Sequence, residues 1–216
     1  MITLIEPMRW QSFMLMLNTI VSYDTLLRWI VPLLADIFVF TYPFYLVYLY
    51  LKWYYHRRDR DMKLALFITL VCICATAVNL GIQEFIIKSR PEQMIHARGI
   101  LLLSHLPTAP FPSDHAAVSR WFFMALLLWS RVLSITTRRS LLIFFALSSI
   151  IMCLSRIAVG VHRPTDIIAG FVVSTLVTIL MIYRPIYHRC DLILYQHIIR
   201  FQHLFFRYIG INHDKI

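Results

Sequence analysis

Five long apolar stretches constrain the fold of this chain more than any other feature. They lie at residues 33–54, 64–87, 115–132, 140–159 and 166–184. A helix that crosses a bilayer needs about 20 largely apolar residues, and each stretch is long enough for one crossing. The whole chain is 59% hydrophobic and only 15% charged, which is too apolar for an ordinary soluble domain. The sequence therefore predicts an all-α, polytopic membrane helix bundle with five spans.

The charged residues predict how this bundle is oriented. The formal net charge is +10, and the basic residues gather in short clusters at 56–63, 131–139 and in the tail from Arg184. Loops rich in Lys and Arg face the cytoplasm, so the connection at 88–112 and the turn near His162 are expected on the opposite side. Clusters between apolar runs favour membrane lipids as partners and argue against a nucleic-acid partner. Oligomeric state cannot be read from the sequence.

The segments on either side of the spans have a different character. Residues 1–32 mix aromatic, aliphatic and charged residues, and this pattern favours helices that lie along the membrane interface over a further span. The tail at 185–216 alternates basic and apolar residues and is expected to form an amphipathic helix on the cytoplasmic surface. Between them, residues 33–184 would form the transmembrane domain.

Three polar clusters are expected at the non-cytoplasmic face, because the predicted topology brings all of them there. Arginine offers phosphate oxygens a planar fork of donors, and two histidines can serve as nucleophile and proton donor. Phosphoryl transfer fits this set, although interfacial arginines can also simply contact lipid headgroups. The clusters are Lys88-Ser89-Arg90-Pro91, Pro112-Ser113-Asp114-His115, and the segment from Ser155-Arg156 through His162 to Asp166.

We expect no metal and no other cofactor at this face. The two histidines lie on different segments, and the clusters show none of the spacings typical of zinc ligands. The chemistry would rest on protein side chains alone.

The third cluster resembles a known signature. Ser155-Arg156, five residues, His162, three residues and Asp166 are similar to the third motif of the PAP2 phosphatase superfamily. The second cluster resembles that family's Pro-Ser-Gly-His motif, and Arg90-Pro91 matches the end of its first motif, Lys-x6-Arg-Pro. The three occur in the family's order, and the resemblance covers the chain from about Leu80 to Asp166.

The resemblance implies a role for each matching residue. His162 would be the nucleophile that forms a phosphohistidine, and Asp166 would accept a hydrogen bond from its other ring nitrogen. His115 would be the general acid that protonates the leaving oxygen. The phosphoryl oxygens would be clamped by Arg90, Arg156 and Ser113, with Ser155 beside them.

Two positions depart from the family's pattern. Gln83 stands where the first motif has lysine, so one expected cation is missing. Lys88 could supply that charge from another angle; otherwise the site would manage with two arginines, or the change would mark a subfamily with another substrate preference. Asp114 replaces the glycine of the second motif, and the resulting segment 111–116 resembles the bacterial undecaprenyl-diphosphate phosphatases.

Glu84 and Arg120 are the remaining charges expected inside the spans near this face. Intramembrane charges tend to pair or to serve function. We therefore expect a bridge between the two side chains, with contact between Arg120 and a second substrate phosphate as the alternative.

The resemblance implies an undecaprenyl-diphosphate phosphatase of the bacterial inner membrane. It would act at the periplasmic or outer face and serve cell-wall biogenesis. Other lipid phosphates remain open as substrates, namely phosphatidylglycerophosphate, phosphatidate and lipid A, as does transfer to a lipid acceptor instead of water. From another class, the chain could be a transporter or a non-catalytic lipid-binding protein.

Overall fold

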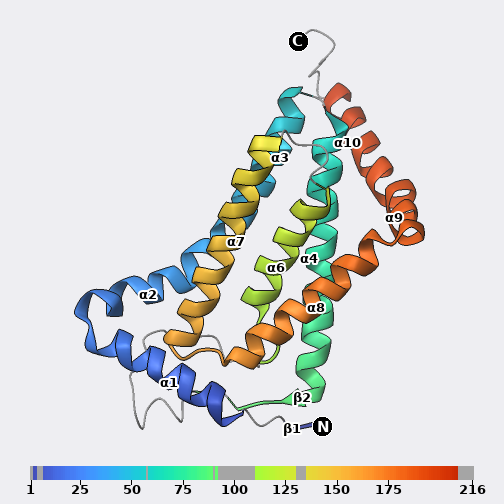
Figure 1. Cartoon of the computed structure of the whole chain (residues 1–216). Helices are drawn as coiled ribbons and strands as arrows, with labels where there is room; N and C mark the ends of the chain where they lie inside the picture. Colours follow the sequence, from blue (N-terminus) through green and yellow to red (C-terminus); the bar gives the residue numbers. More distant parts are fainter. Residues whose placement is uncertain are drawn as a thin grey trace.

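The computed structural model describes residues 2–3, 7–56, 58–89, 91, 110–129 and 135–208. Helices account for nearly all of this part of the chain (Figure 1). The elements are β1 (Ile2–Thr3), α1 (Met8–Tyr23), α2 (Thr25–Ile37), the 3₁₀ turn η1 (Phe38–Phe40), α3 (Thr41–His56), α4 (Asp59–Phe85), β2 (Ile86–Ile87), α6 (Asp114–Trp129), α7 (Ile135–Ala158), α8 (Pro164–Ile182), α9 (Arg184–Cys190), the π-helical segment η3 (Asp191–Tyr195) and α10 (Gln196–Tyr208).

Four helical runs are long and apolar enough to cross a membrane, and they match four of the five predicted spans. They are Thr25–His56, Asp59–Phe85, Arg139–Ala158 and Pro164–Ile182. The first of these runs begins before residue 33, where the predicted span starts, and contains that span entirely. That run begins at α2 because Asp24 caps the helix, its side chain accepting a hydrogen bond from the Leu27 amide at 2.8 Å.

The remaining predicted span, 115–132, corresponds to α6 at the centre of the bundle. Helix α6 packs against α4, α7 and α8 (Figure 1). Its 16 described residues would rise about 24 Å, which is shorter than a hydrocarbon core of about 30 Å. Residues 130–134 lie outside the described part of the chain, so a complete crossing by α6 stays a prediction.

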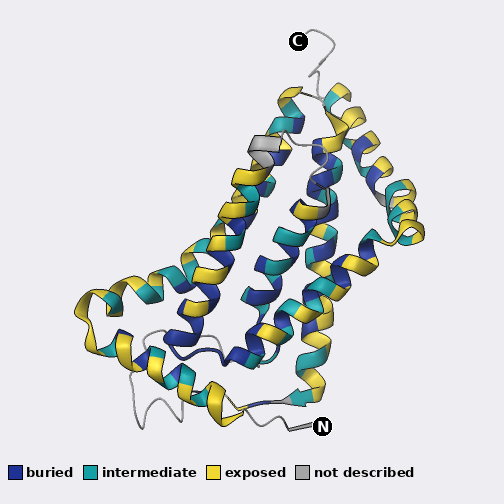
Figure 2. Cartoon of the chain, viewed as in Figure 1, coloured by how far each residue is buried: buried dark blue, intermediate teal, exposed yellow. Residues whose placement is uncertain are grey.

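The packing is that of a bundle with an apolar exterior. Rings from α3, α6 and α7 meet in its centre, with the Phe122 and Phe145 ring centroids 4.6 Å apart. Large apolar side chains also cover the outer helix faces, such as Ile73 on α4, Leu147 on α7 and Leu176 on α8 (Figure 2). Such surfaces suit lipid as solvent.

The N-terminal elements fasten one end of the bundle. Helix α1 lies across the end where α7 and α8 meet (Figure 1), and the buried Asn18 amide donates to the Ala158 carbonyl at 2.8 Å. Strand β1 pairs in parallel with β2, just before Lys88. Both contacts fix segments that carry the predicted site. An interfacial position for α1 stays a prediction.

The C-terminal tail is helical, as its composition predicted, and it folds back onto the bundle. Ile199 on α10 is buried in a cluster with Trp53 and Met62, and Phe206 packs against the same cluster. The described part of the tail is therefore anchored at the end of the bundle opposite α1 (Figure 1).

Candidate active site

The connection between α7 and α8 is short because a glycine two residues after the end of α7 turns the chain. Gly160 has φ 85°, a conformation that glycine adopts without steric cost. Its amide bonds the Ile157 carbonyl, and the Val161 amide bonds the Arg156 carbonyl, the pattern of a Schellman C-cap. Pro164 then opens α8 at a position where its missing N–H costs nothing. His162 is thereby placed between two helix ends.

The His162 ring is buried and is oriented through Nδ1. That atom lies 3.1 Å from the Pro110 carbonyl oxygen and 3.7 Å from Oδ2 of Asp166. Both neighbours are acceptors, so Nδ1 carries the proton and Nε2 carries the lone pair. Nδ1 thus faces two acceptors, a backbone carbonyl and, slightly farther away, the Asp166 carboxylate to which the expected bond is directed.

Asp166 is fully buried and its two oxygens have different partners. Oδ2 accepts from the Arg163 amide at 2.8 Å and so closes the first turn of α8. Oδ1 lies 2.6 Å from the Lys88 ammonium, which is also buried and also contacts Thr165. The charge of Lys88 is therefore directed at Asp166. Its predicted contact with substrate phosphate stays a prediction.

The second motif is held tightly against the start of α8. Ser113 precedes the first residue of α6, and its hydroxyl lies 3.5 Å from the Ala116 amide, which is the geometry of an N-cap. Its own amide donates to the Asp166 carbonyl at 3.0 Å. The two helices approach so closely that a Cβ added at Gly170 would lie 2.5 Å from the Ser113 carbonyl oxygen.

The two departures from the family's pattern contact each other. The Gln83 amide nitrogen lies 3.4 Å from Oδ1 of Asp114 and 3.2 Å from the Pro112 carbonyl oxygen. Asn79, one turn earlier on α4, donates to the same Asp114 oxygen at 2.8 Å. Two neutral amides therefore hold this carboxylate and tie α4 to the second motif.

Asp36 on α2 also reaches the site, and the sequence interpretation missed it. Its Oδ1 accepts a hydrogen bond from Nη1 of Arg156 and lies 3.6 Å from Nε2 of His115. The Asp36 carboxylate thus bridges Arg156, which is assigned to the phosphate clamp, and His115, which is assigned as the proton donor. The sequence did carry a signal for Asp36, because a single acid inside an apolar stretch marks a functional position.

Arg163 is a second residue that the sequence interpretation did not single out. Its side chain is buried, and Nη2 donates to the Ser89 hydroxyl at 3.2 Å. It joins the segment after β2 to the turn that carries His162. Nothing in the motif spacing pointed to it, because the residue after the histidine is not part of the signature.

The predicted bridge between Glu84 and Arg120 is not formed. Nε of Arg120 donates to the Thr175 hydroxyl at 3.3 Å, and the guanidinium lies 5.6 Å from the centre of the Phe123 ring. Arg120 faces α8, whereas Glu84 is exposed on α4. The two side chains therefore leave their helices in different directions.

Arg90 lies outside the described residues, so its place in the clamp stays a prediction. Ser155 is buried in the last turn of α7, next to Arg156. Among the residues that the structure describes, no group of three or more His, Cys, Asp or Glu side chains is arranged to hold a metal ion.

The fold and this cluster define a multi-pass membrane protein with two histidines, a buried carboxylate and an arginine gathered at one end of its bundle. The model of the PAP2 superfamily matches residues 64–189. The chain belongs to the PAP2 superfamily.

A solved structure supports the same fold. It is the crystal structure of a transmembrane PAP2-type phosphatidylglycerolphosphate phosphatase from Bacillus subtilis, with a TM-score of 0.62 and 19% sequence identity. The match covers 81% of this chain and 85% of that one. A comparison with curated proteins gave no match.

Proposed function

We propose that this protein is a lipid phosphatase that hydrolyses undecaprenyl diphosphate through a phosphohistidine on His162. The observation that carries the proposal is the orientation of this ring. A proton held on Nδ1 by the Pro110 carbonyl leaves the Nε2 lone pair as the nucleophile. Arg156 and His115 meet at Asp36, which brings a phosphate-binding fork and a proton donor to the same site.

The reaction would take place in two displacements. Nε2 of His162 attacks phosphorus while the bond to the leaving oxygen breaks, and His115 gives that oxygen its proton. Water then attacks the phosphohistidine and returns a proton to His115, the P–N bond breaks, and inorganic phosphate leaves. Arg156, together with Arg90, would balance the charge on the equatorial oxygens in both steps.

Asp166 and Lys88 act through His162 in this proposal. As His162 forms its bond to phosphorus, the ring becomes positively charged. The carboxylate 3.7 Å away stabilises that charge. Lys88 in turn keeps the buried carboxylate ionised and fixed, at 2.6 Å from Oδ1. Both are positioning residues.

Asp36 is a positioning residue as well. Its carboxylate accepts a hydrogen bond from Nη1 of Arg156 and so sets the direction of a guanidinium whose planar fork suits phosphate oxygens. The same oxygen lies 3.6 Å from Nε2 of His115 and so helps to fix the position of that ring. One acid would thus orient the clamp and support the proton donor.

The substrate assignment rests on segment 111–116, which resembles the undecaprenyl-diphosphate phosphatases. The solved structure that shares this fold is a phosphatidylglycerolphosphate phosphatase, so phosphatidylglycerophosphate is the second candidate. Both substrates carry a terminal phosphoryl group on a membrane lipid. They differ in the leaving group, which is a lipid phosphate in the first and a glycerol oxygen in the second.

A substrate panel tests this proposal. The purified chain would be given undecaprenyl diphosphate, phosphatidylglycerophosphate, phosphatidate and lipid A, and released phosphate would be measured with no metal added. We expect the highest kcat/KM for undecaprenyl diphosphate. A higher value for phosphatidylglycerophosphate would move the assignment to the second candidate, and no release from any substrate would overturn the phosphatase assignment.

The proposal also places the site in the cell. The basic segment at 56–63 and the basic tail at 185–216 would face the cytoplasm of a bacterium, and the site, at the other end of the bundle, would face the periplasm or exterior. Residues 33–184 would carry the chemistry, with residues 1–32 covering the catalytic end at the interface.

A further inference from the structure

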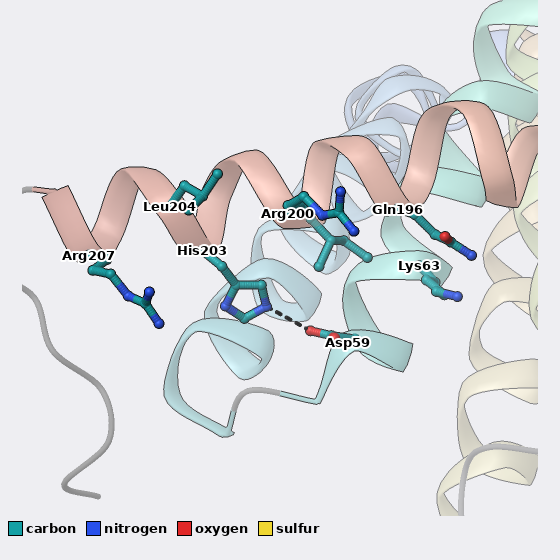
Figure 3. Close-up of a pocket in the computed structure, with 8 residues that line it drawn as sticks. Asp59, Lys63, Gln196, Arg200, His203, Leu204 and Arg207 are labelled. Atoms are coloured by element: carbon teal, nitrogen blue, oxygen red, sulfur yellow. Dashed lines mark hydrogen bonds and ion pairs between the residues drawn. The ribbon is translucent and has the colours of Figure 1, made fainter.

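A pocket lies between α10 and the start of α4, at the end of the bundle opposite the candidate active site (Figure 1). Its volume is about 410 Å³. Figure 3 shows the residues of α10 facing those of α4 across it. Its polar lining comes from Asp59, Lys63, Gln196, Arg200, His203 and Arg207.

The acid of this pocket already has two partners. Oδ1 of Asp59 accepts from the buried Trp53 ring nitrogen at 3.2 Å and lies 3.1 Å from Nε2 of His203 (Figure 3). These contacts join α3, α4 and α10 at one carboxylate. They hold the pocket walls in place and leave the negative charge of Asp59 already paired with donors.

Lys63 is also neutralised, by an acid outside the pocket. Its ammonium lies 2.7 Å from Oδ1 of Asp191. Burial alone would raise the pKa of Asp191, but hydrogen bonds from Lys63 and Gln196 hold that pKa below its ordinary value. Arg200 and Arg207 make no ion pair with any acid in the described part of the chain. The pocket therefore presents two uncompensated guanidinium groups.

The side chains of α10 fall into three stripes, given about 100° of rotation per residue. The first is buried against the bundle and includes Ile199 and Phe206. The second is the basic stripe that lines the pocket. The third is apolar and exposed, with the spacing i, i+3, i+4 and i+7; its members are Phe201, Leu204, Phe205 and Tyr208. The basic stripe lies between the other two.

A basic stripe beside an exposed apolar stripe matches a ligand that is both anionic and apolar. We propose that the pocket binds the headgroup of an anionic phospholipid, with its phosphate on the basic stripe and an acyl chain along the exposed apolar stripe. A free phosphate ion would use only the first of these surfaces. Since this end of the bundle is the one predicted to face the cytoplasm, the lipid would come from the inner leaflet.

The experiment counts lipids retained by the full-length protein in native mass spectrometry, after incubation with phosphatidylglycerol in detergent. We expect one tightly held phosphatidylglycerol in the wild type. The double variant R200Q/R207Q should bind it about tenfold more weakly, as expected for losing a charge-assisted hydrogen bond. R189A should bind as the wild type does, because Arg189 is exposed on α9 and does not line the pocket.

Further arms separate the alternatives. R200K/R207K keeps the positive charge at both positions and should bind phosphatidylglycerol better than the glutamine variant. That difference would assign the loss to charge and not to unfolding. Phosphatidylcholine should not bind. Equal loss in R189A, or no loss in R200Q/R207Q, would overturn the pocket as the site. If inorganic phosphate displaces phosphatidylglycerol at equal concentration, the occupant is a soluble anion and the lipid assignment fails.

Discussion

Gln83 and Asp114, the two residues that depart from the PAP2 sequence pattern, lie in contact, with the glutamine amide nitrogen 3.4 Å from Oδ1 of the aspartate. The family has a lysine and a glycine at these positions. In this chain an amide and a carboxylate join α4 to the second motif instead. The missing lysine and the additional acid therefore concern one and the same local contact.

This relationship predicts that the two positions are energetically coupled. Q83A and D114A should each lower the thermal midpoint, because each leaves a polar partner unsatisfied. The double variant should lose less than the sum of the two, with a coupling of about 0.5–1.5 kcal/mol. Thermal unfolding in one detergent measures the cycle. Strict additivity would mean that the 3.4 Å contact carries no energy.

Lys88 should be required for stability as well as for turnover. K88M removes one partner of a buried ion pair and leaves the Asp166 charge uncompensated, which costs about 3–5 kcal/mol in comparable cases. The double variant K88M/D166N should recover much of the thermal midpoint while remaining inactive. If K88M instead keeps its thermal midpoint and only raises KM, the lysine binds substrate phosphate and the positioning role is wrong.

Gly170 should be intolerant of any side chain. A methyl group there would meet the Ser113 carbonyl oxygen at 2.5 Å, and overpacking of this kind costs about 1–3 kcal/mol. Because α6 and α8 must separate, G170A should lose both thermal stability and phosphatase turnover. Gly81 provides the matched control, since nothing lies within 4 Å of its added Cβ. G81A should behave as the wild type or be slightly more stable.

Asp36 should affect catalysis more than folding. D36N keeps the shape of the side chain but removes the charge that holds Arg156, so kcat/KM should fall about tenfold to hundredfold. D36E should recover part of the loss. D24N is the control, because Asp24 caps the same helix from its far end and asparagine caps equally well. A decrease of equal size in D24N would assign the effect to α2 as a whole.

Much of the architecture followed from the sequence because its causes are local. Long apolar stretches predict spans, and four of them form helices that are long and apolar enough to cross a membrane. Alternation of the spans then predicted that all three motifs would reach one end of the bundle.

The errors and omissions concern directions of side chains between distant elements. Asp36 meets Arg156 across 120 positions of sequence, and no spacing rule encodes that contact. Lys88 directly follows β2, whose pairing with β1 involves two residues in each strand, too few for a sequence pattern to predict. Arg120 faces Thr175 on α8 instead of Glu84.

The most direct test of the account is to trap the phosphorylated enzyme. The purified protein would be mixed with undecaprenyl diphosphate labelled in its terminal phosphate, quenched in alkali within the first turnover, digested and mapped by mass spectrometry. We predict an acid-labile phosphoryl group on His162, absent from H162Q, which should retain its fold and release no phosphate. Full turnover by H162Q, or a label that maps to another residue, would contradict the mechanism.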